Sequence, residues 1–284
     1  MNTDVCATPS IVQLAKDGDT EGVWKLLQKE EDVNARNFIG QTALHKAATA
    51  GNDDLVRVLI GVGAEVDSAD RKCQTPLYSA VFNLHTSTSF LLLEKGANPE
   101  GNSKHLNTPL QIAIMHKNAA ILKILLEYEA NTAMTFSNGR VCAIDFLLST
   151  TIDGRVCFDM MKSLLLHGCA LDYNHVTLQR MTMSPLFACI FYLKPAAILV
   201  LLYEFGCQRW DFNWRDNRLY ERREDREFVA TYVTKKAGSP RSLLSTCRVY
   251  LYHVLQRKPL RYLNHLALPR TLKEYLLFSD LQYF

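Results

Sequence analysis

Residues 42–45, Thr42-Ala43-Leu44-His45, begin a segment that recurs twice at a step of 33 residues. The later copies are Thr75-Pro76-Leu77-Tyr78 and Thr108-Pro109-Leu110-Gln111. A second marker keeps the same step, at Gly63-Ala64, Gly96-Ala97 and Glu129-Ala130. Two independent markers in phase over three units indicate a repeat array, and a period of about 20–50 residues is typical of solenoids.

Each unit predicts a pair of helices. Threonine is a favourable N-cap, because its hydroxyl accepts a hydrogen bond from an unpaired backbone N–H of the first turn. Proline fits the next position, where its missing N–H costs nothing. The first complete unit predicts helices over 44–50 and 54–62, which Gly51 and Gly63 end. Glycine suits both ends because it adopts left-handed backbone at low cost.

This pattern resembles the ankyrin repeat, whose signature T-P-L-H has a period of 33. The resemblance covers residues 8–208 and implies about six repeats, some of them divergent. An entry repeat spans 11–37, a fifth around 139–170 holds about seven inserted residues near 149–155, and a sixth begins at Ser184 and closes at 206–207. The family implies protein binding along a face formed by turn tips and first helices.

Three turn tips are therefore the candidate substrate contacts. They are Phe38-Ile39, Arg71-Lys72 and His105-Leu106, and Phe38-Ile39 is unusually apolar for a turn. His45 could act as a base beside the hydroxyl of Thr42. Because that histidine belongs to the repeat signature, we expect it instead to bond to Thr42 or to neighbouring backbone and to stabilise the repeat.

The composition contains no sign of catalytic, metal or cofactor chemistry. The chain has no phosphate-binding glycine loop, no histidine spacing typical of a metal site and no cysteine pair at zinc spacing. We expect no enzymatic activity, no metal and no cofactor. A net charge of only +3 over 284 residues gives no case for nucleic acid.

The cysteines and the apolar runs indicate a reduced, non-membrane setting. The eight cysteines are scattered, and the N-terminal residues do not form a signal peptide. The apolar stretch 185–203 is divided by Lys194-Pro195 into runs shorter than the roughly 20 residues of a spanning helix. We expect no membrane contact and a location in the cytoplasm or also the nucleus.

Residues 210–226 mix aromatic side chains with five arginines, which is typical of interfaces and nucleic-acid surfaces. Neighbouring acidic residues cancel that charge, however. We favour a terminal cap on the last repeat, with Trp210 and Trp214 packed inward.

The C-terminal tail carries a second pattern. Ser242 is a plausible N-cap, and Leu243, Cys247, Leu251 and Leu255 repeat every four residues beyond it. Such spacing places an apolar stripe along about three turns of helix. Val249, Tyr250 and Val254 lie off this stripe, so the helix should have more apolar surface than one neighbour covers.

Here the sequence resembles the SOCS box. Ser242-Leu243-x-x-x-Cys247-x-x-x-Leu251 matches that family's elongin-binding segment, and Leu268-Pro269 lies in what is similar to its cullin-binding segment. The family motif there is L-P-Φ-P, whereas this chain has Leu266-Ala267-Leu268-Pro269. Both segments in order, within 45 residues and behind ankyrin repeats, resemble the ankyrin repeat and SOCS box family.

The resemblance implies a substrate receptor of a cullin–RING ubiquitin ligase. Leu243, Cys247 and Leu251 would bind elongin C, paired with elongin B, and Leu268 and Pro269 would help to select the fifth cullin with its RING subunit. The implied fold is all-α: an ankyrin solenoid followed by a small three-helix SOCS box. The expected divisions are ankyrin repeats over 8–208, a capping or linking segment over 209–238 and the SOCS box over 239–284.

Two alternatives stay open. The chain could be an ankyrin scaffold outside any ligase, with a tail that only caps the last repeat. It could also bind the elongins yet engage a cullin weakly, because Ala267 stands where the family has proline. The substrate protein is unknown in every case.

Overall fold

A computed structural model of the protein describes residues 10–136, 139–149, 153–169, 171, 175–176, 182–183, 185–207, 225–237, 243–255, 262–263 and 265–281. Contacts between residues group the chain into two compact units, Met1–Ala130 and Asn131–Phe284. We call them the N-terminal unit and the C-terminal unit and describe each by itself.

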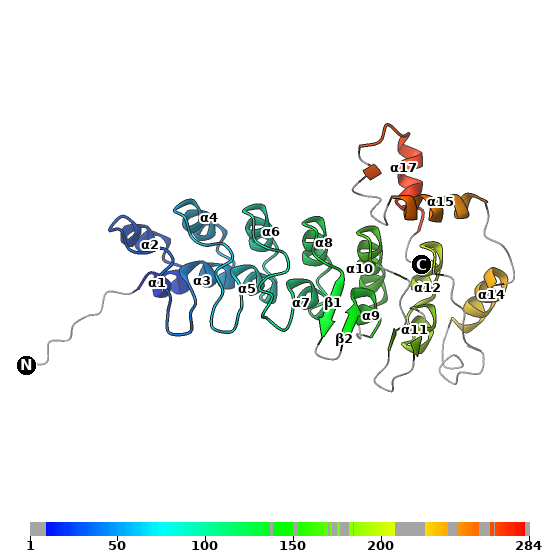
Figure 1. Ribbon diagram of the computed structural model, residues 1–284, viewed down its shortest axis with the longest axis horizontal. Helices are drawn as coiled ribbons and strands as arrows, with labels where there is room; N and C mark the ends of the chain where they lie inside the picture. The colour runs from blue at the N-terminus through cyan, green and yellow to red at the C-terminus, as the bar shows by residue number, and fades with distance from the viewer. Residues whose placement is uncertain are drawn as a thin grey trace, which may run out of the picture. The chain divides into compact units, whose positions relative to one another are not determined.

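The N-terminal unit is a stack of four helix pairs (Figure 1). The pairs are α1 (Ile11–Asp17) with α2 (Thr20–Leu27), α3 (Ala43–Ala50) with α4 (Asp53–Gly61), α5 (Pro76–Phe82) with α6 (Thr86–Glu94), and α7 (Pro109–Met115) with α8 (Ala119–Glu127). First helices pack on first helices, as α1, α3, α5 and α7 do in turn, and α4, α6 and α8 form a second row. Their shared apolar residues make one continuous core, which confirms the predicted solenoid.

The predicted caps begin the first helices. The Thr75 hydroxyl accepts from the Tyr78 N–H at 3.2 Å, and the Thr108 hydroxyl accepts from the Gln111 N–H at 3.3 Å. Asparagine does the same for second helices, where the Asn52 side chain accepts from the Leu55 N–H at 3.0 Å. Each cap satisfies a donor that the helix itself leaves unpaired.

Left-handed residues between the two helices of a pair recur even where glycine does not. Gly51 has φ 72°, and its equivalents Leu84 and Lys117 have φ 64° and 58°. A side chain in this region is disfavoured by roughly 1–2 kcal/mol. The stacked repeats therefore hold the turn geometry against local preference, which explains why the loss of glycine does not end the array.

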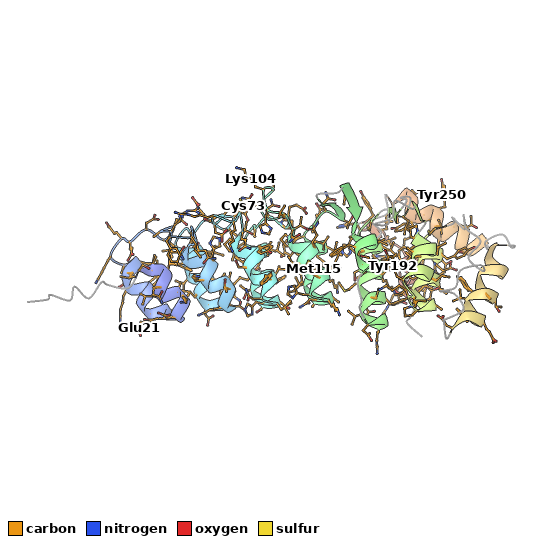
Figure 2. All side chains as sticks on the ribbon, turned by 90° about the horizontal axis from the view of Figure 1, so that it is seen from below. Glu21, Cys73, Lys104, Met115, Tyr192 and Tyr250 are labelled. Atoms are coloured by element: carbon orange, nitrogen blue, oxygen red, sulfur yellow. The ribbon has the colours of Figure 1, made fainter. Side chains whose placement is uncertain are left out.

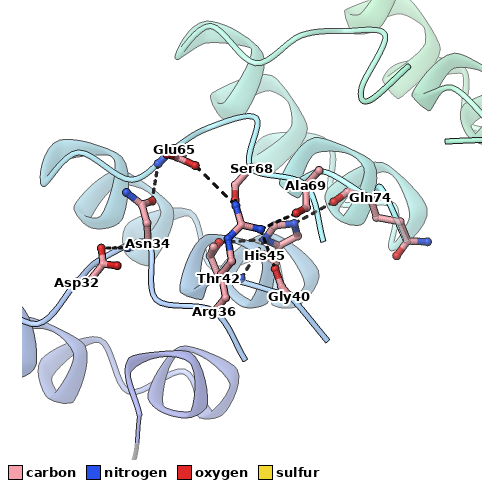
Figure 3. Close-up of polar contacts among 10 residues, drawn as sticks. All are labelled: Asp32, Asn34, Arg36, Gly40, Thr42, His45, Glu65, Ser68, Ala69 and Gln74. Carbon is pink, nitrogen blue, oxygen red and sulfur yellow. Dashed lines mark hydrogen bonds and ion pairs between the residues drawn. The ribbon is translucent and has the colours of Figure 1, made fainter. Parts of the chain in front are cut away.

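Polar side chains join consecutive repeats, and Figure 3 shows one such junction. The Arg36 guanidinium donates to the Ala69 carbonyl at 2.6 Å and to the Ser68 hydroxyl at 2.7 Å. His45 is fully buried, with its Nε2 3.0 Å from the Gln74 carbonyl. Because a carbonyl only accepts, Nε2 carries the proton and Nδ1 accepts from the Thr42 N–H. The structural role predicted for His45 is confirmed.

The C-terminal unit opens with further helix pairs and two short hairpins. Its elements are β1 (Ala133–Phe136), β2 (Gly139–Cys142), α9 (Ala143–Ser149), α10 (Gly154–Leu166), β3 (His175–Val176), β4 (Thr182–Met183), α11 (Pro185–Phe191) and α12 (Ala196–Glu204). Strands β1 and β2 are antiparallel, as are β3 and β4. The predicted helical architecture is confirmed, but these strands were not predicted.

The fifth repeat takes up part of its predicted insertion inside a helix. Helix α10 has 13 residues, whereas α4, α6 and α8 have nine each. Asp153 caps its first turn, accepting from the N–H groups of Arg155 and Val156. Extra residues that continue an amphipathic helix keep their backbone paired, so the repeat tolerates them.

Three more helices are described in full or in part after the repeats. These are α14 (Arg226–Ala237), α15 (Leu243–Val254) and α17 (Arg270–Leu276), with Tyr262 and Leu263 also helical. Trp210 and Trp214, the predicted cap contacts, lie outside the described residues, as does Ser184. Among the described helices, none combines the length and apolar character that crossing a bilayer requires.

Candidate functional site

Helix α15 has one exposed apolar face. Cys247 is exposed, and Tyr250, Leu251 and Val254 are 67%, 38% and 56% exposed. At 3.6 residues per turn these four side chains fall within about 100° of arc. Figure 2 shows Tyr250 on this helix. We call Cys247, Tyr250, Leu251 and Val254 the exposed face of α15.

The predicted stripe and the exposed face overlap. Leu243 is the first residue of α15, so the helix begins directly after Ser242, as a cap at that residue requires. The side chains of Leu243 and Ser242 lie outside the described ones. Tyr250 and Val254, which the sequence suggested were off the stripe, share its side of the helix.

Arg248 anchors the opposite face of α15. It is only 3% exposed, and its guanidinium carbon lies 3.6 Å from the centre of the Tyr275 ring and 4.8 Å from that of Phe278. Its Nη2 also forms an ion pair of 2.8 Å with Asp280. A guanidinium between two rings gains cation–π attraction as well as packing. The residue thereby fixes α15 against α17.

An aromatic cluster joins the same face to the last repeats. The rings of Phe205 and Phe278 stack at 3.7 Å between centroids, and Tyr252 meets both edge-on. Tyr252 is 2% exposed, and its hydroxyl donates to the Leu165 carbonyl at 2.6 Å. Burial of three aromatic rings supplies far more apolar area than one aliphatic contact would.

Polar contacts surround that cluster. The Ser245 hydroxyl donates to Glu204 at 3.1 Å, and the ammonium of Lys162 donates to the Leu281 carbonyl at 2.9 Å. Burial lowers the pKa of Lys162. The tail helices are thus packed on α10 and α12 through their inner face, while the exposed face of α15 stays uncovered.

Leu268 and Pro269 lie at the start of α17. Leu268 is half-buried, Pro269 is exposed, and Pro269 occupies the N-cap position of the helix. The Leu268 N–H donates to the Leu266 carbonyl at 2.8 Å, which forms a three-residue turn centred on exposed Ala267. Leu266 is itself 43% exposed, so an apolar and accessible segment precedes the helix.

The six predicted substrate residues lie on turns of the N-terminal unit. Phe38 and Leu106 are 81% and 82% exposed, Ile39 is 38% exposed, and Arg71 and Lys72 are exposed too. His105 is only half-buried, and its ring lies 4.4 Å from that of Tyr78. Figure 2 shows Cys73 and Lys104 on the same edge, which the turns of successive repeats form.

Family models of known proteins match both parts of the chain. A model of three ankyrin repeats matches residues 11–103, a single ankyrin repeat matches 105–135, and the SOCS box matches 239–277. The chain belongs to the ankyrin repeat and SOCS box family. Its two kinds of module act in proteins as non-catalytic adaptors.

Individual relatives are similar over about a quarter of the chain. A serine/threonine-protein kinase 12 from Arabidopsis thaliana is 42% identical over 72 residues, which cover 25% of this chain and 16% of the kinase. Notch-regulated ankyrin repeat-containing protein A from Danio rerio is 36% identical over 86 residues, which cover 28% and 77%. Its human counterpart is 33% identical over 88 residues, with the same shares. Because the match spans so little of the kinase, its activity is not carried over.

The SOCS box contains two anchoring residues, Arg248 and Tyr252, that the sequence pattern does not mark. Neither Arg248 nor Tyr252 belongs to the apolar stripe or to the motifs of the tail. Their i, i+4 spacing on the side opposite Cys247 and Leu251 was the available signal. A lone arginine between apolar positions predicts a solvated charge. Its burial becomes evident only from its contacts with the rings of Tyr275 and Phe278.

The described cysteines and acidic groups give no further site. Among described residues, no three His, Cys, Asp or Glu side chains gather closely enough to hold a metal ion. Burial raises the pKa of the Cys157 thiol to about 11, which keeps it protonated and unreactive at neutral pH.

Proposed function

We propose that this protein is the substrate receptor of an elongin–cullin–RING ubiquitin ligase. The observation that carries the proposal is the exposed apolar face of α15 inside a SOCS box that follows ankyrin repeats. The receptor works by proximity: it holds a target protein near a ubiquitin-charged enzyme that other subunits supply. A reducing compartment, the cytoplasm or nucleus, suits this role.

Elongin C, paired with elongin B, is the partner proposed for the exposed face of α15. Leu243 enters a pocket, and Cys247 and Leu251 pack beside it. The accessible side chains of Tyr250 and Val254 support a contact wider than those three residues. An amphipathic helix laid in an apolar groove is a recurring mode of recognition.

The first experiment is co-purification with elongin B/C. Full burial of a leucine contributes about 1.5–3 kcal/mol, so Leu243→Ala should weaken binding by roughly ten- to a hundredfold. Cys247→Ala should weaken it less, because a smaller side chain is lost. Thr246→Ala, on the same helix but outside the exposed face, is the matched control. Unchanged elongin recovery with both Leu243→Ala and Cys247→Ala would refute the adaptor role.

The fifth cullin is the partner proposed for Leu268 and Pro269. Proline's fixed φ of about −65° is compatible with the centre of an inverse γ-turn, the position that Ala267 occupies between Leu266 and Leu268. We expect Ala267→Pro to fold and to bind the cullin several-fold more tightly. Titration of the elongin complexes with cullin measures this. If the natural chain already binds tightly and proline adds nothing, the missing residue is immaterial.

A scaffold outside any ligase is the second candidate. The stack of Phe278 on Phe205 favours it, because a tail that only caps the array would make that contact. A cap alone leaves the exposed face of α15 unexplained, however. The division into repeats over 8–208, a capping segment over 209–238 and a SOCS box over 239–284 remains part of the proposal.

A further inference from the structure

The turns of the N-terminal unit form a regular edge with a distinctive mixture of side chains. We call residues 37–40, 70–73 and 103–106 the turn edge. Phe38, Arg71 and Lys104 recur at the sequence step of 33, and Lys104 stands one place further along its turn, level with Lys72. Apart from Ser103, the exposed side chains of this edge are apolar or cationic: Phe38, Ile39, Arg71, Lys72, Lys104 and Leu106.

Each turn of the edge is held by the same device. The Asn37 side chain accepts from the Ile39 N–H at 3.1 Å, Asp70 from the Lys72 N–H at 2.8 Å, and Asn102 from the Lys104 N–H at 2.9 Å. The first two turns are also joined directly, since the Arg71 N–H donates to the Ile39 carbonyl at 3.1 Å. A ligand would meet preorganised turns and lose little affinity to ordering them.

The cations of the edge form no ion pair with the described residues of the unit. Among the described residues, no carboxylate lies within ion-pairing distance of the side chains of Arg71, Lys72 or Lys104. Asp70, the one acid of the edge, is buried and accepts backbone N–H groups from Lys72 and Gln74. The missing counter-charge points to acidic groups on a partner.

The charge of the whole unit favours a peptide over nucleic acid. Residues 1–130 hold 12 Lys and Arg against 16 Asp and Glu, so the unit as a whole is acidic, whereas the exposed charges of the edge are cationic. A phosphate chain needs a broader basic surface than three side chains among acidic neighbours. The exposed Phe38 and Leu106 would also be unused by a phosphate backbone.

Spacing then sets the form of the ligand. Packed helices lie about 8–10 Å apart, so successive turns are separated by about that distance. An extended chain rises about 3.3 Å per residue, so three residues span one repeat. We propose that the turn edge binds an extended, acidic substrate segment in which carboxylates follow a bulky apolar side chain at the third and sixth positions. The apolar group meets Phe38, and the carboxylates meet Arg71 and Lys104. This inference rests on the proposed receptor function and specifies its substrate.

The test uses the full chain co-purified with elongin B/C. It selects from a displayed library of random peptides that share one fixed, central aromatic residue. We expect Asp and Glu to be enriched at the third and sixth positions on one side of that residue. In fluorescence polarisation the selected peptide should bind the Arg71→Glu/Lys104→Glu double variant about tenfold or more weakly than it binds the natural chain. Lys95→Glu, an exposed cation at the end of α6, should change affinity less than twofold.

Several results would overturn the inference. They are no enrichment, acidic enrichment without the three-residue register, selected peptides that bind the double variant equally well, or tighter binding of a single-stranded oligonucleotide at the same edge. Elongin recovery from the same samples separates the two proposals. Intact recovery with failed selection refutes only the acidic segment, whereas lost recovery in the natural chain refutes the receptor.

Discussion

At the scale of single residues, one position shows how the repeats tolerate sequence change. His45, Tyr78 and Gln111 stand at the same place in consecutive units. Gln111 accepts from the Thr108 N–H at 2.9 Å, as His45 does from Thr42, whereas Tyr78 packs against His105. The capping threonine is the same in all three units, whereas the residue three positions after it is histidine, tyrosine or glutamine.

His45 should make stability depend on pH. Burial lowers its pKa, so the folded state favours the neutral imidazole. Its contribution is complete above the unfolded pKa of about 6.5 and is lost as the pH falls below it, because only the unfolded chain then takes up the proton. We expect His45→Gln to reduce the loss of stability between neutral and mildly acidic pH. The glutamine can accept from the Thr42 N–H as Gln111 accepts from the Thr108 N–H, but it does not titrate. Urea unfolding at both pH values measures it, and an unaltered pH dependence would contradict the role assigned to His45.

At the scale of elements, α15 has a packed inner face and an exposed outer face. The inner face, with Arg248 and Tyr252, contacts α17 and the last repeats. The outer face, with Cys247 and Leu251, contacts nothing within the described chain that buries it. Because the inner face packs against the rest of the unit and the outer face is a second apolar surface, the helix is apolar over much of its circumference.

The anchoring of α15 depends on ring contacts more than on charge. We expect Arg248→Ala to destabilise the SOCS box by about 1–3 kcal/mol, through loss of packing and of cation–π attraction worth about 0.5–2 kcal/mol. Asp280 is half-exposed, so Asp280→Asn should cost under about 1 kcal/mol. Thermal unfolding compares the two. Equal losses would mean that the ion pair, and not the rings, fixes Arg248.

Sequence patterns predicted the repeats better than the contacts between them. Threonine caps and the step of 33 are local signals, and helices α3, α5 and α7 begin where those signals placed them. The packing of Phe205 on Phe278 joins positions far apart in sequence, and no periodic pattern in the sequence predicts this contact. For the same reason the stripe on α15 could be predicted from spacing, but the residues that hold its other face could not.

At the scale of the whole molecule, the SOCS box and the last repeats belong to one unit. Residues 131–284 form it together, and the buried rings of Phe205, Tyr252 and Phe278 connect the last repeats to the SOCS box. The boundary between sequence families therefore does not coincide with a boundary in packing. The last repeats and the SOCS box share part of the same core.

Removing one ring of that core should disturb only its own unit. Phe278→Ala should destabilise the C-terminal unit by about 3–5 kcal/mol, because the buried ring leaves a cavity beside Phe205. Hydrogen exchange should then accelerate in α10, α12 and α15 but not in α3 to α7. Exchange that rises equally in the N-terminal unit would contradict the division into two units.

The Phe205–Phe278 stack has a consequence for the recombination of this protein's modules. A chimera cut at residue 239 would graft the SOCS box without Phe205, the ring against which Phe278 stacks. Conversely, deleting the tail to make an inactive control would leave Phe205 bare and invite aggregation. Point changes on the outer side of α15 are the cleaner tool, and a transplant should carry α10 and α12 with it.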